Sequence, residues 1–168
     1  MIQVHASRSA HQLFLARPYH TALDRSRGKV PSRTMTVADI YHPNEAILES
    51  LYNDLTTIAA YSTEDVILHP ATRATDSSAT DVVGRAAVQA WEQGLVAATN
   101  GTLCMEVEHI VANNSFGTVI GTLCARFGET AFAQPFCGLW RFRDGLIAEH
   151  WENVADPELL MTVLAASN

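Results

Sequence analysis

The stretch FCGLWRFRDGLIAEHWEN, residues 136–153, decides the fold. It contains two runs of mostly apolar and aromatic residues, which Asp144-Gly145 joins. An Asp-Gly pair between two such runs is a strong signal for a two-residue hairpin, because both turn positions need a backbone that tolerates positive φ. The stretch therefore predicts two antiparallel strands, at 131–143 and 146–154, that meet at this turn.

The segments before and after this hairpin alternate between helical and strand patterns. Apolar residues recur at helical spacing in two regions, whereas four runs are rich in the residues that strands prefer. In chain order we expect a helix from His42 to Ile58, a strand at 65–69, a polar loop at 71–81, a helix from Gly84 to Thr99, strands at 102–112 and 117–127, the hairpin, and a helix that begins at Asp156. This order indicates an α+β fold.

Charge divides the chain of 168 residues into two parts. Six of the eleven basic residues precede Met35, where Asp24 is the only acid, whereas the remainder carries 5 basic and 17 acidic residues. We therefore expect residues 1–34 to be a poorly ordered N-terminal extension and residues 35–168 to form one domain. A domain so acidic repels phosphate backbones, which disfavours a nucleic-acid partner.

The apolar runs and the cysteines indicate the class and the compartment. No run approaches the roughly 18 consecutive apolar residues of a membrane span, so we expect no membrane association. An export signal needs an uninterrupted apolar run, which the first thirty residues lack. Cys104, Cys124 and Cys137 are odd in number and lack metal-ligand spacing. We expect a soluble protein of the reducing cytoplasm.

The hairpin turn also predicts which side chains share a face of the sheet. Pairing Arg143 with Leu146 and continuing away from the turn places Leu139 opposite His150. One face then holds Cys137, Leu139, Arg141, Ala148, His150 and Glu152, and the other holds Phe136, Trp140, Phe142, Ile147, Trp151, Glu149 and Asn153.

The motif W-R-F-R-D-G-x-I-x-E-H-W-E, with the order of elements over about residues 40–165, resembles the SnoaL-like branch of the nuclear transport factor two-like superfamily. The resemblance implies a cone-shaped fold in which helices pack over the concave face of a curved antiparallel sheet and enclose a pocket. It also implies a homodimer. Relatives include polyketide cyclases, ketosteroid isomerases, limonene epoxide hydrolases, dehydratases and members without known catalysis, so the fold does not decide the chemistry.

His150 and Glu152 are the catalytic candidates. The resemblance implies that one sheet face lines the pocket and the other meets a partner subunit. We assign these two residues to the pocket and the aromatic face to the partner, because large apolar patches seldom stay exposed. A histidine two residues from a buried carboxyl can serve as an acid–base pair near neutral pH. The alternative is that both side chains only hydrogen-bond within the sheet.

Four residues are candidates for binding the substrate: Tyr52, His69, Trp91 and Arg126. Tyr52 lies on the first helix where it can reach the pocket, and Trp91 lies on the apolar stripe of the second. Arg126 can hold an anionic oxygen, or it pairs with surface acids. His69 ends the first strand as a pocket wall or base, and its alternative is a structural histidine of the core.

One departure from the family weakens a hydrolase function. Glu152 falls near the second catalytic aspartate of limonene epoxide hydrolases, which also need an Arg-x-Asp sequence to activate water. Here Arg126-Phe127-Gly128 lacks that carboxylate, so the same chemistry requires Glu129 as a substitute.

The sequence predicts neither a metal site nor a cofactor. His69, His109 and His150 show no i, i+4 pairing with one another and no two-histidine-plus-carboxylate motif, and no glycine-rich phosphate loop is present. The first hypothesis is therefore a cofactor-independent enzyme that transfers protons on a hydrophobic small molecule, by isomerisation, aldol cyclisation or dehydration. The second is a non-catalytic protein that binds a small molecule or acts as a dimeric interaction module. The third is water activation of the epoxide-hydrolase kind.

Overall fold

The computed structural model describes residues 41–127 and 130–165. The boundary that we expect after residue 34 lies outside these residues. In chain order the elements are α1 (Pro43–Asn53), η2 (Leu55–Ala60), β1 (Ser62–His69), η3 (Ala71–Ala74), β2 (Val82–Val83), α2 (Arg85–Ala98), β3 (Cys104–Ala112), β4 (Phe116–Phe127), β5 (Thr130–Arg143), β6 (Leu146–Trp151) and α3 (Pro157–Ala165). Within this part of the chain, no helix is long and apolar enough to cross a membrane.

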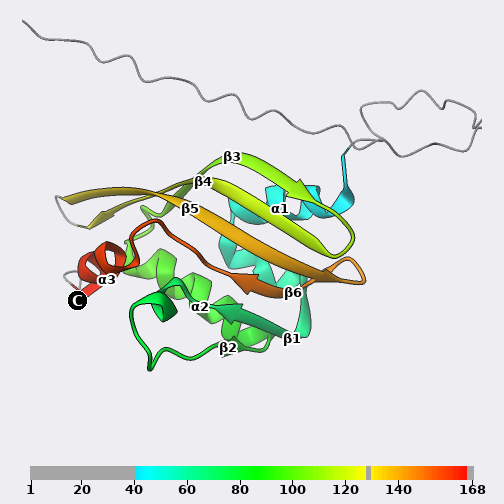
Figure 1. Ribbon diagram of the computed structural model, residues 1–168, viewed down its shortest axis with the longest axis horizontal. Coiled ribbons are helices and arrows are strands. Elements are labelled where there is room, and N and C mark those ends of the chain that lie inside the picture. The colour runs from blue at the N-terminus through cyan, green and yellow to red at the C-terminus, as the bar shows by residue number, and fades with distance from the viewer. Residues whose placement is uncertain (1–40, 128–129, 166–168) are drawn as a thin grey trace, which may run out of the picture. The chain divides into compact units, whose positions relative to one another are not determined.

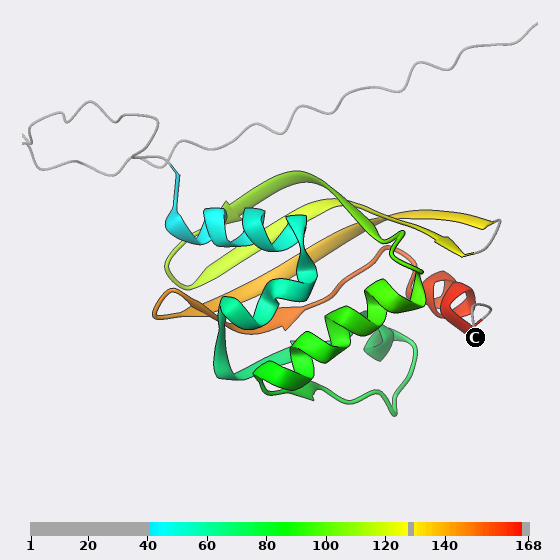
Figure 2. The same cartoon turned by 180° about the vertical axis from the view of Figure 1, so that it is seen from behind.

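The six strands form one curved, open sheet in the order β2-β1-β6-β5-β4-β3 (Figure 1). β1 and β6 run parallel, and all other neighbours are antiparallel. Seen from behind, α1 (cyan) and α2 (green) lie over one face of the sheet (Figure 2). The expected α+β fold is confirmed, with a mixed sheet in place of a purely antiparallel one.

Local sequence explains where the first helix begins. The Nδ1 atom of His42 accepts a hydrogen bond from the Asn44 amide at 3.1 Å, and the Glu45 carboxylate accepts one from the His42 amide at 3.2 Å. Together they form a capping box, and Pro43 occupies the first helical position, where its missing N–H costs nothing. The predicted start of this helix is confirmed.

The second helix ends at the predicted stop. Asn100 and Gly101 follow it with φ of 50° and 74°, the left-handed conformation that commonly terminates helices. Side chains of α1 and α2 then pack on the sheet, where Leu48, Leu51 and Val88 are fully buried. Each such side chain stabilises the fold by about 1.5–3 kcal/mol relative to an exposed one. This packing holds the two helices over one sheet face.

The predicted hairpin turn is confirmed. Asp144 and Gly145 have φ of 53° and 76°, as a two-residue turn of type I′ requires, and Arg143 pairs with Leu146 on either side. β5 and β6 are thus consecutive antiparallel neighbours. Their turn lies at the end of the sheet away from α3 (Figure 1).

The pairing that we predicted beyond this turn is wrong by one residue. The register shifts after the second pair, so that Arg141 pairs with Glu149 and Trp140 with His150. Ala148 is the extra residue, a β-bulge that breaks the alternation of faces along β6. Because side chains alternate with a period of two, this single residue moves His150 to the face that carries Trp140.

The bulge therefore corrects the two predicted faces. The aromatic residues of β5 do not form a subunit contact, since Phe136, Trp140 and Phe142 are at most 6% exposed and face the helices. His150 shares that inner face with them, and its ring stacks on that of Trp140 with centroids 3.5 Å apart. The outer face instead carries Phe116, Thr118, Ile120, Cys137, Leu139, Arg141, Glu149 and Trp151.

Candidate active site

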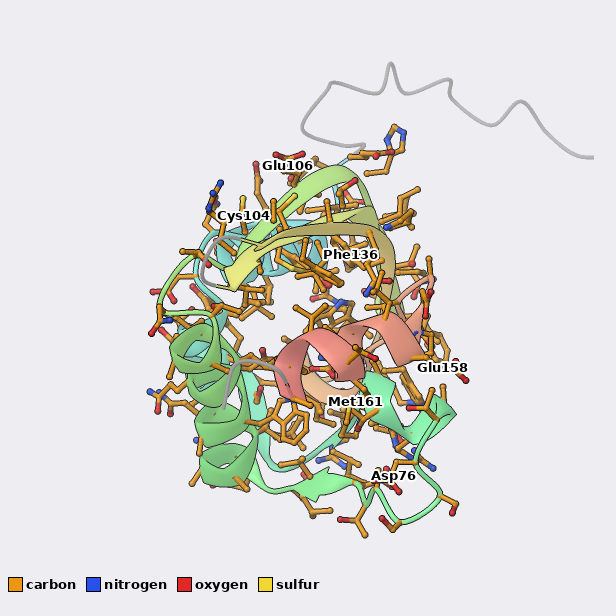
Figure 3. All side chains as sticks on the ribbon, turned by 90° about the vertical axis from the view of Figure 1, so that its left-hand side faces the viewer. Asp76, Cys104, Glu106, Phe136, Glu158 and Met161 are labelled. Atoms are coloured by element: carbon orange, nitrogen blue, oxygen red, sulfur yellow. The ribbon has the colours of Figure 1, made fainter. Side chains whose placement is uncertain are left out.

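A pocket of about 140 Å³ lies between the inner face of the sheet and the helices. Side chains of α1, α2, β3, β4, β5 and α3 line it, together with η3 and the residues that follow β6. In Figure 3 Phe136 projects from β5 toward this interior, whereas Glu106 points outward from β3. Nearly all of the lining is apolar, and its polar side chains are those of Tyr52, Thr72, Trp91, Glu92, Thr99, His150, Glu152 and Asn153.

Two carboxyl groups share this apolar pocket. Glu92 lies on α2 and is 1% exposed, and its Oε1 atom has no hydrogen-bond partner in the described part of the protein. Glu152 follows β6 and accepts two hydrogen bonds, from the indole N–H of Trp91 at 3.0 Å and from the amide of Ala71 at 3.1 Å. The two carboxyls thus differ sharply in how well a negative charge is stabilised.

This difference decides which carboxyl holds a proton. Burial raises the pKa of Glu92 well above its ordinary value, and repulsion from Glu152 raises it further. Burial also raises the pKa of Glu152, but its two N–H donors oppose that rise. Since the pair resists carrying two charges, Glu92 holds its proton more tightly and Glu152 is the carboxyl that ionises first.

His150 is a neutral side chain in this site. Burial lowers its pKa to about 3, with a smaller contribution from His69. Its Nδ1 atom lies 4.0 Å from Oε1 of Glu92 and has no hydrogen-bond partner among the described residues. We expected His150 to titrate near neutral pH, and the structure does not support that expectation. A neutral imidazole can still donate or accept a hydrogen bond.

The hydroxyl of Tyr52 reaches the pocket beside Gly138. A Cβ atom placed on Gly138 would lie 2.2 Å from this hydroxyl, 3.0 Å from Nε1 of Trp140 and 3.5 Å from Nε2 of His150. Three polar atoms therefore converge on a space that only glycine leaves open. Burial raises the pKa of Tyr52 far above its ordinary value, so the hydroxyl remains a hydrogen-bond donor.

The structure brings together four of the six residues that the sequence identified, since Tyr52, Trp91, His150 and Glu152 all line the pocket. It adds Glu92, which our sequence analysis missed. A signal for Glu92 was present, because it lies four residues after Val88 on the apolar stripe of the helix. A carboxyl in such a stripe must be buried with the stripe.

His69 lies on the other side of the sheet. Leu68 points inward from β1 and is fully buried, so the next side chain points outward. Its ring stacks on Trp151 at 4.8 Å, and its nitrogens lie 2.8 Å from Asp81 and 3.4 Å from Glu149. These contacts fit a histidine that ties a loop to the outer face of the sheet.

Arg126 also lies away from the pocket. Ala125 lines the pocket from β4, and the alternation of the strand turns Arg126 to an exposed position. Glu129, which epoxide-hydrolase chemistry would need beside it, lies outside the described residues. Among residues 41–127 and 130–165, no group of three histidine, cysteine or acidic side chains is placed to hold a metal ion.

This arrangement can move protons. A carboxylate held by two N–H donors is a base, a neutral carboxyl beside it is an acid, and a buried tyrosine hydroxyl can stabilise a developing oxyanion. All three groups open onto one largely apolar cavity, where charge–charge and hydrogen-bond interactions are stronger than in water.

Solved structures with the same fold share little sequence with this chain. Bal32a, from a soil-derived mobile gene cassette, is 19% identical with a TM-score of 0.63, over 73% of this chain and 96% of its own. A protein of unknown function with a cystatin-like fold from Xanthomonas campestris is 20% identical with a TM-score of 0.61, over 72% and 97%. A nuclear transport factor two-like protein from Burkholderia pseudomallei is 17% identical with a TM-score of 0.58, over 74% and 98%.

These likenesses establish the fold alone, and no curated protein matches the sequence significantly. The model of the SnoaL-like domain matches residues 44–150, which is more than half of the chain. The match contains α1, α2 and most of the sheet that together surround the pocket. The protein therefore belongs to the SnoaL-like domain family.

Proposed function

We propose that this protein is a cofactor-independent enzyme that moves a proton within a small, mostly apolar organic molecule. The observation that carries the proposal is the unequal pair of carboxyls, Glu152 with two N–H donors and Glu92 with an unpartnered oxygen, in one apolar pocket. Carboxyls whose surroundings push their pKa values apart are typical of acid–base sites.

The proposal gives a role to each group. The carboxylate of Glu152 takes a proton from a carbon next to a carbonyl group, which leaves an enolate. The hydroxyl of Tyr52 donates a hydrogen bond to the enolate oxygen, and the carboxyl of Glu92 returns a proton at a second position. The same sequence, with a different final step, serves isomerisation, aldol cyclisation or dehydration. His150 is a positioning residue, because its ring is neutral and stacked on Trp140.

The experiment that tests the proposal follows deuterium uptake. Cyclohexanone and 2-tetralone are incubated with the protein in D₂O, and proton NMR measures exchange at the carbon next to the carbonyl. We expect the protein to accelerate exchange and Glu152→Gln to reduce the acceleration by about 100-fold or more. Glu106→Gln is the matched control, since Glu106 is exposed on the outer face of β3.

Two results would contradict the proposal. If Glu152→Gln folds, as judged by circular dichroism and thermal unfolding, and exchanges deuterium as fast as the wild type, then Glu152 is not the base. If the wild type does not accelerate exchange, the result supports the alternative, a non-catalytic binding protein. That alternative predicts ligand binding that survives Glu152→Gln without any turnover.

We also propose that two copies of the chain associate through the outer face of the sheet. Phe116, Ile120 and Leu139 are 47%, 39% and 39% exposed there, and cross-strand pairing brings them into adjacent rows. Exposed apolar patches of this kind mark interfaces. We expect light scattering after size exclusion to give the mass of a dimer, and Leu139→Asp to give a folded monomer. Val83→Asp on the edge strand is the control, and a monomeric wild type contradicts the proposal.

A further inference from the structure

We propose that the molecule bound in this pocket carries a positively charged nitrogen with at least one N–H, as a protonated amine, attached to a compact apolar body. The inference deepens the proposed function, because it names the substrate class of the same pocket. It rests on the proposed function only for the location of the site. The charge of the ligand is argued from the residues that face the cavity.

The pocket has negative charge without a counterion. Its titratable groups are Tyr52, Glu92, His150 and Glu152, and neither lysine nor arginine is among the described residues that line it. The tyrosine and the histidine are both neutral in this environment. Once Glu152 ionises, the cavity therefore carries one negative charge that no lining side chain neutralises.

Two basic side chains on elements that line the pocket, η3 and α2, are paired with other groups. Arg73 lies 2.8 Å from Asp81. Arg85 lies 2.8 Å from Glu64, and it also donates to the backbone carbonyl of Ser62. No described side chain therefore supplies the cation that would neutralise the carboxyl pair, and a charged ligand can supply it.

One buried oxygen is ready to receive such a group. Oε1 of Glu92 has no hydrogen-bond partner in the part of the chain that the structure describes, although the residue is only 1% exposed. A buried acceptor without a partner is costly, and an ammonium N–H would satisfy it with a charge-assisted bond. The opposite carboxylate, Glu152, is held open to the same cavity by its two donors.

Aromatic rings supply the rest of the site for a cation. Tyr52, Trp91, Phe132 and Phe136 all line the pocket, and the rings of Tyr52 and Phe136 stack with centroids 5.6 Å apart. The faces of such rings attract ammonium groups, most strongly where water is excluded. A cavity of about 140 Å³ is close to the volume that accepts benzene in an engineered protein, so one ring can enter.

Anions and neutral molecules fit this environment less well. A carboxylate or phosphate would meet an uncompensated carboxylate across an apolar cavity, where like charges repel strongly. A neutral hydroxyl can bond to Glu92 but leaves the charge of Glu152 without a counterion. An ammonium satisfies both groups, and it stabilises the ionised form of Glu92, so this carboxyl gives up its proton more readily. The proton passes to solvent when the bound molecule, such as a simple amine probe, has no carbon that accepts it.

The test uses three probes of similar shape that differ in charge: benzylamine is a cation, benzyl alcohol is neutral and benzoate is an anion. Isothermal titration calorimetry of the full-length protein at neutral pH measures their affinities. We expect benzylamine to bind roughly 30-fold more tightly than benzyl alcohol, the size of one desolvated cation–aromatic contact, and benzoate not to bind. Benzyl alcohol binding as tightly as benzylamine, or any binding of benzoate, would overturn the inference.

Proton release provides a readout that does not depend on activity. Titrations in two buffers with different enthalpies of ionisation should show that benzylamine releases up to one proton and benzyl alcohol none. Glu92→Gln, which mimics the neutral carboxyl in shape, should fold and abolish this release. Glu106→Gln should leave it unchanged. Release that persists in Glu92→Gln would refute the assigned site.

The outcomes separate this inference from the proposed function. Preference for benzylamine without deuterium exchange would support an amine-binding protein and refute the enzyme. Exchange that depends on Glu152, with no preference for benzylamine, would support the enzyme and refute the charge of its substrate.

Discussion

Gly138→Ala tests whether the hydroxyl of Tyr52 is held where the proposed mechanism needs it. The new methyl group would lie 2.2 Å from this hydroxyl, which must move by more than 1 Å to reach ordinary contact at 3.4 Å. Overpacking of this kind costs about 1–3 kcal/mol. Replacing glycine by alanine returns about 0.4–1 kcal/mol through the unfolded chain. We therefore expect a net loss of about 1–2 kcal/mol, or roughly 2–8 °C in Tm.

The assay is a double-mutant cycle by urea denaturation. Tyr52→Phe removes the atom that the methyl group meets, so Gly138→Ala should cost less in that background, with a coupling energy of about 1 kcal/mol or more. Gly94→Ala on α2 is the control, since its methyl group meets nothing within 4 Å. It should stabilise the protein by about 0.5–1 kcal/mol. Coupling below about 0.3 kcal/mol between the first two positions would refute the reasoning.

Two further predictions concern the carboxyl pair. The pKa of Glu92 in the folded protein is raised above its ordinary value of 4.5, so the folded state binds a proton that the unfolded state loses. The stability of the wild type should therefore fall relative to that of Glu92→Gln as the pH rises from about 4.5. Urea denaturation of both proteins across about pH 4–8 checks this sign, and a stability difference that stays constant with pH contradicts it. Trp91→Phe removes a hydrogen-bond donor to Glu152, which should raise the pKa of this carboxyl. The acidic side of the pH–rate profile for deuterium exchange should therefore shift to higher pH by about one unit. A profile that does not shift contradicts the role of the indole.

The sequence predicted the turn of the central hairpin but not its bulge. Asp144-Gly145 carries a local signal, because few residues adopt positive φ at little cost. Ala148 has no such local signal. Its bulge accompanies a contact between two strands, the stacking of His150 on Trp140, which the sequence around Ala148 does not reveal. One unpredicted residue was enough to exchange the inner and outer faces of β5, although His150 and Glu152 were still assigned to the pocket.

The candidate site shows the same division between local and distant causes. Simple alternation along β1 and β4 would have removed His69 and Arg126 from the pocket, because Leu68 and Ala125 occupy the inward positions. Helical spacing would likewise have added Glu92. The positions of His69, Arg126 and Glu92 could therefore be predicted from the sequence, once it is known which side of each strand and helix faces the core.

The asymmetry of the carboxyl pair has no such local signature. Both donors to Glu152 are distant in sequence: the indole of Trp91 is 61 positions away and the backbone amide of Ala71 is 81 positions away. Any residue except proline at position 71 keeps the backbone donor, so among the described residues Trp91 is the side chain that donates to Glu152. A sequence shows two buried glutamates, but only the folded chain shows which of them is the base. The difference between a base and an acid in this pocket therefore depends on the complete burial of Glu92 and on two distant N–H donors to Glu152, the backbone of Ala71 and the indole of Trp91.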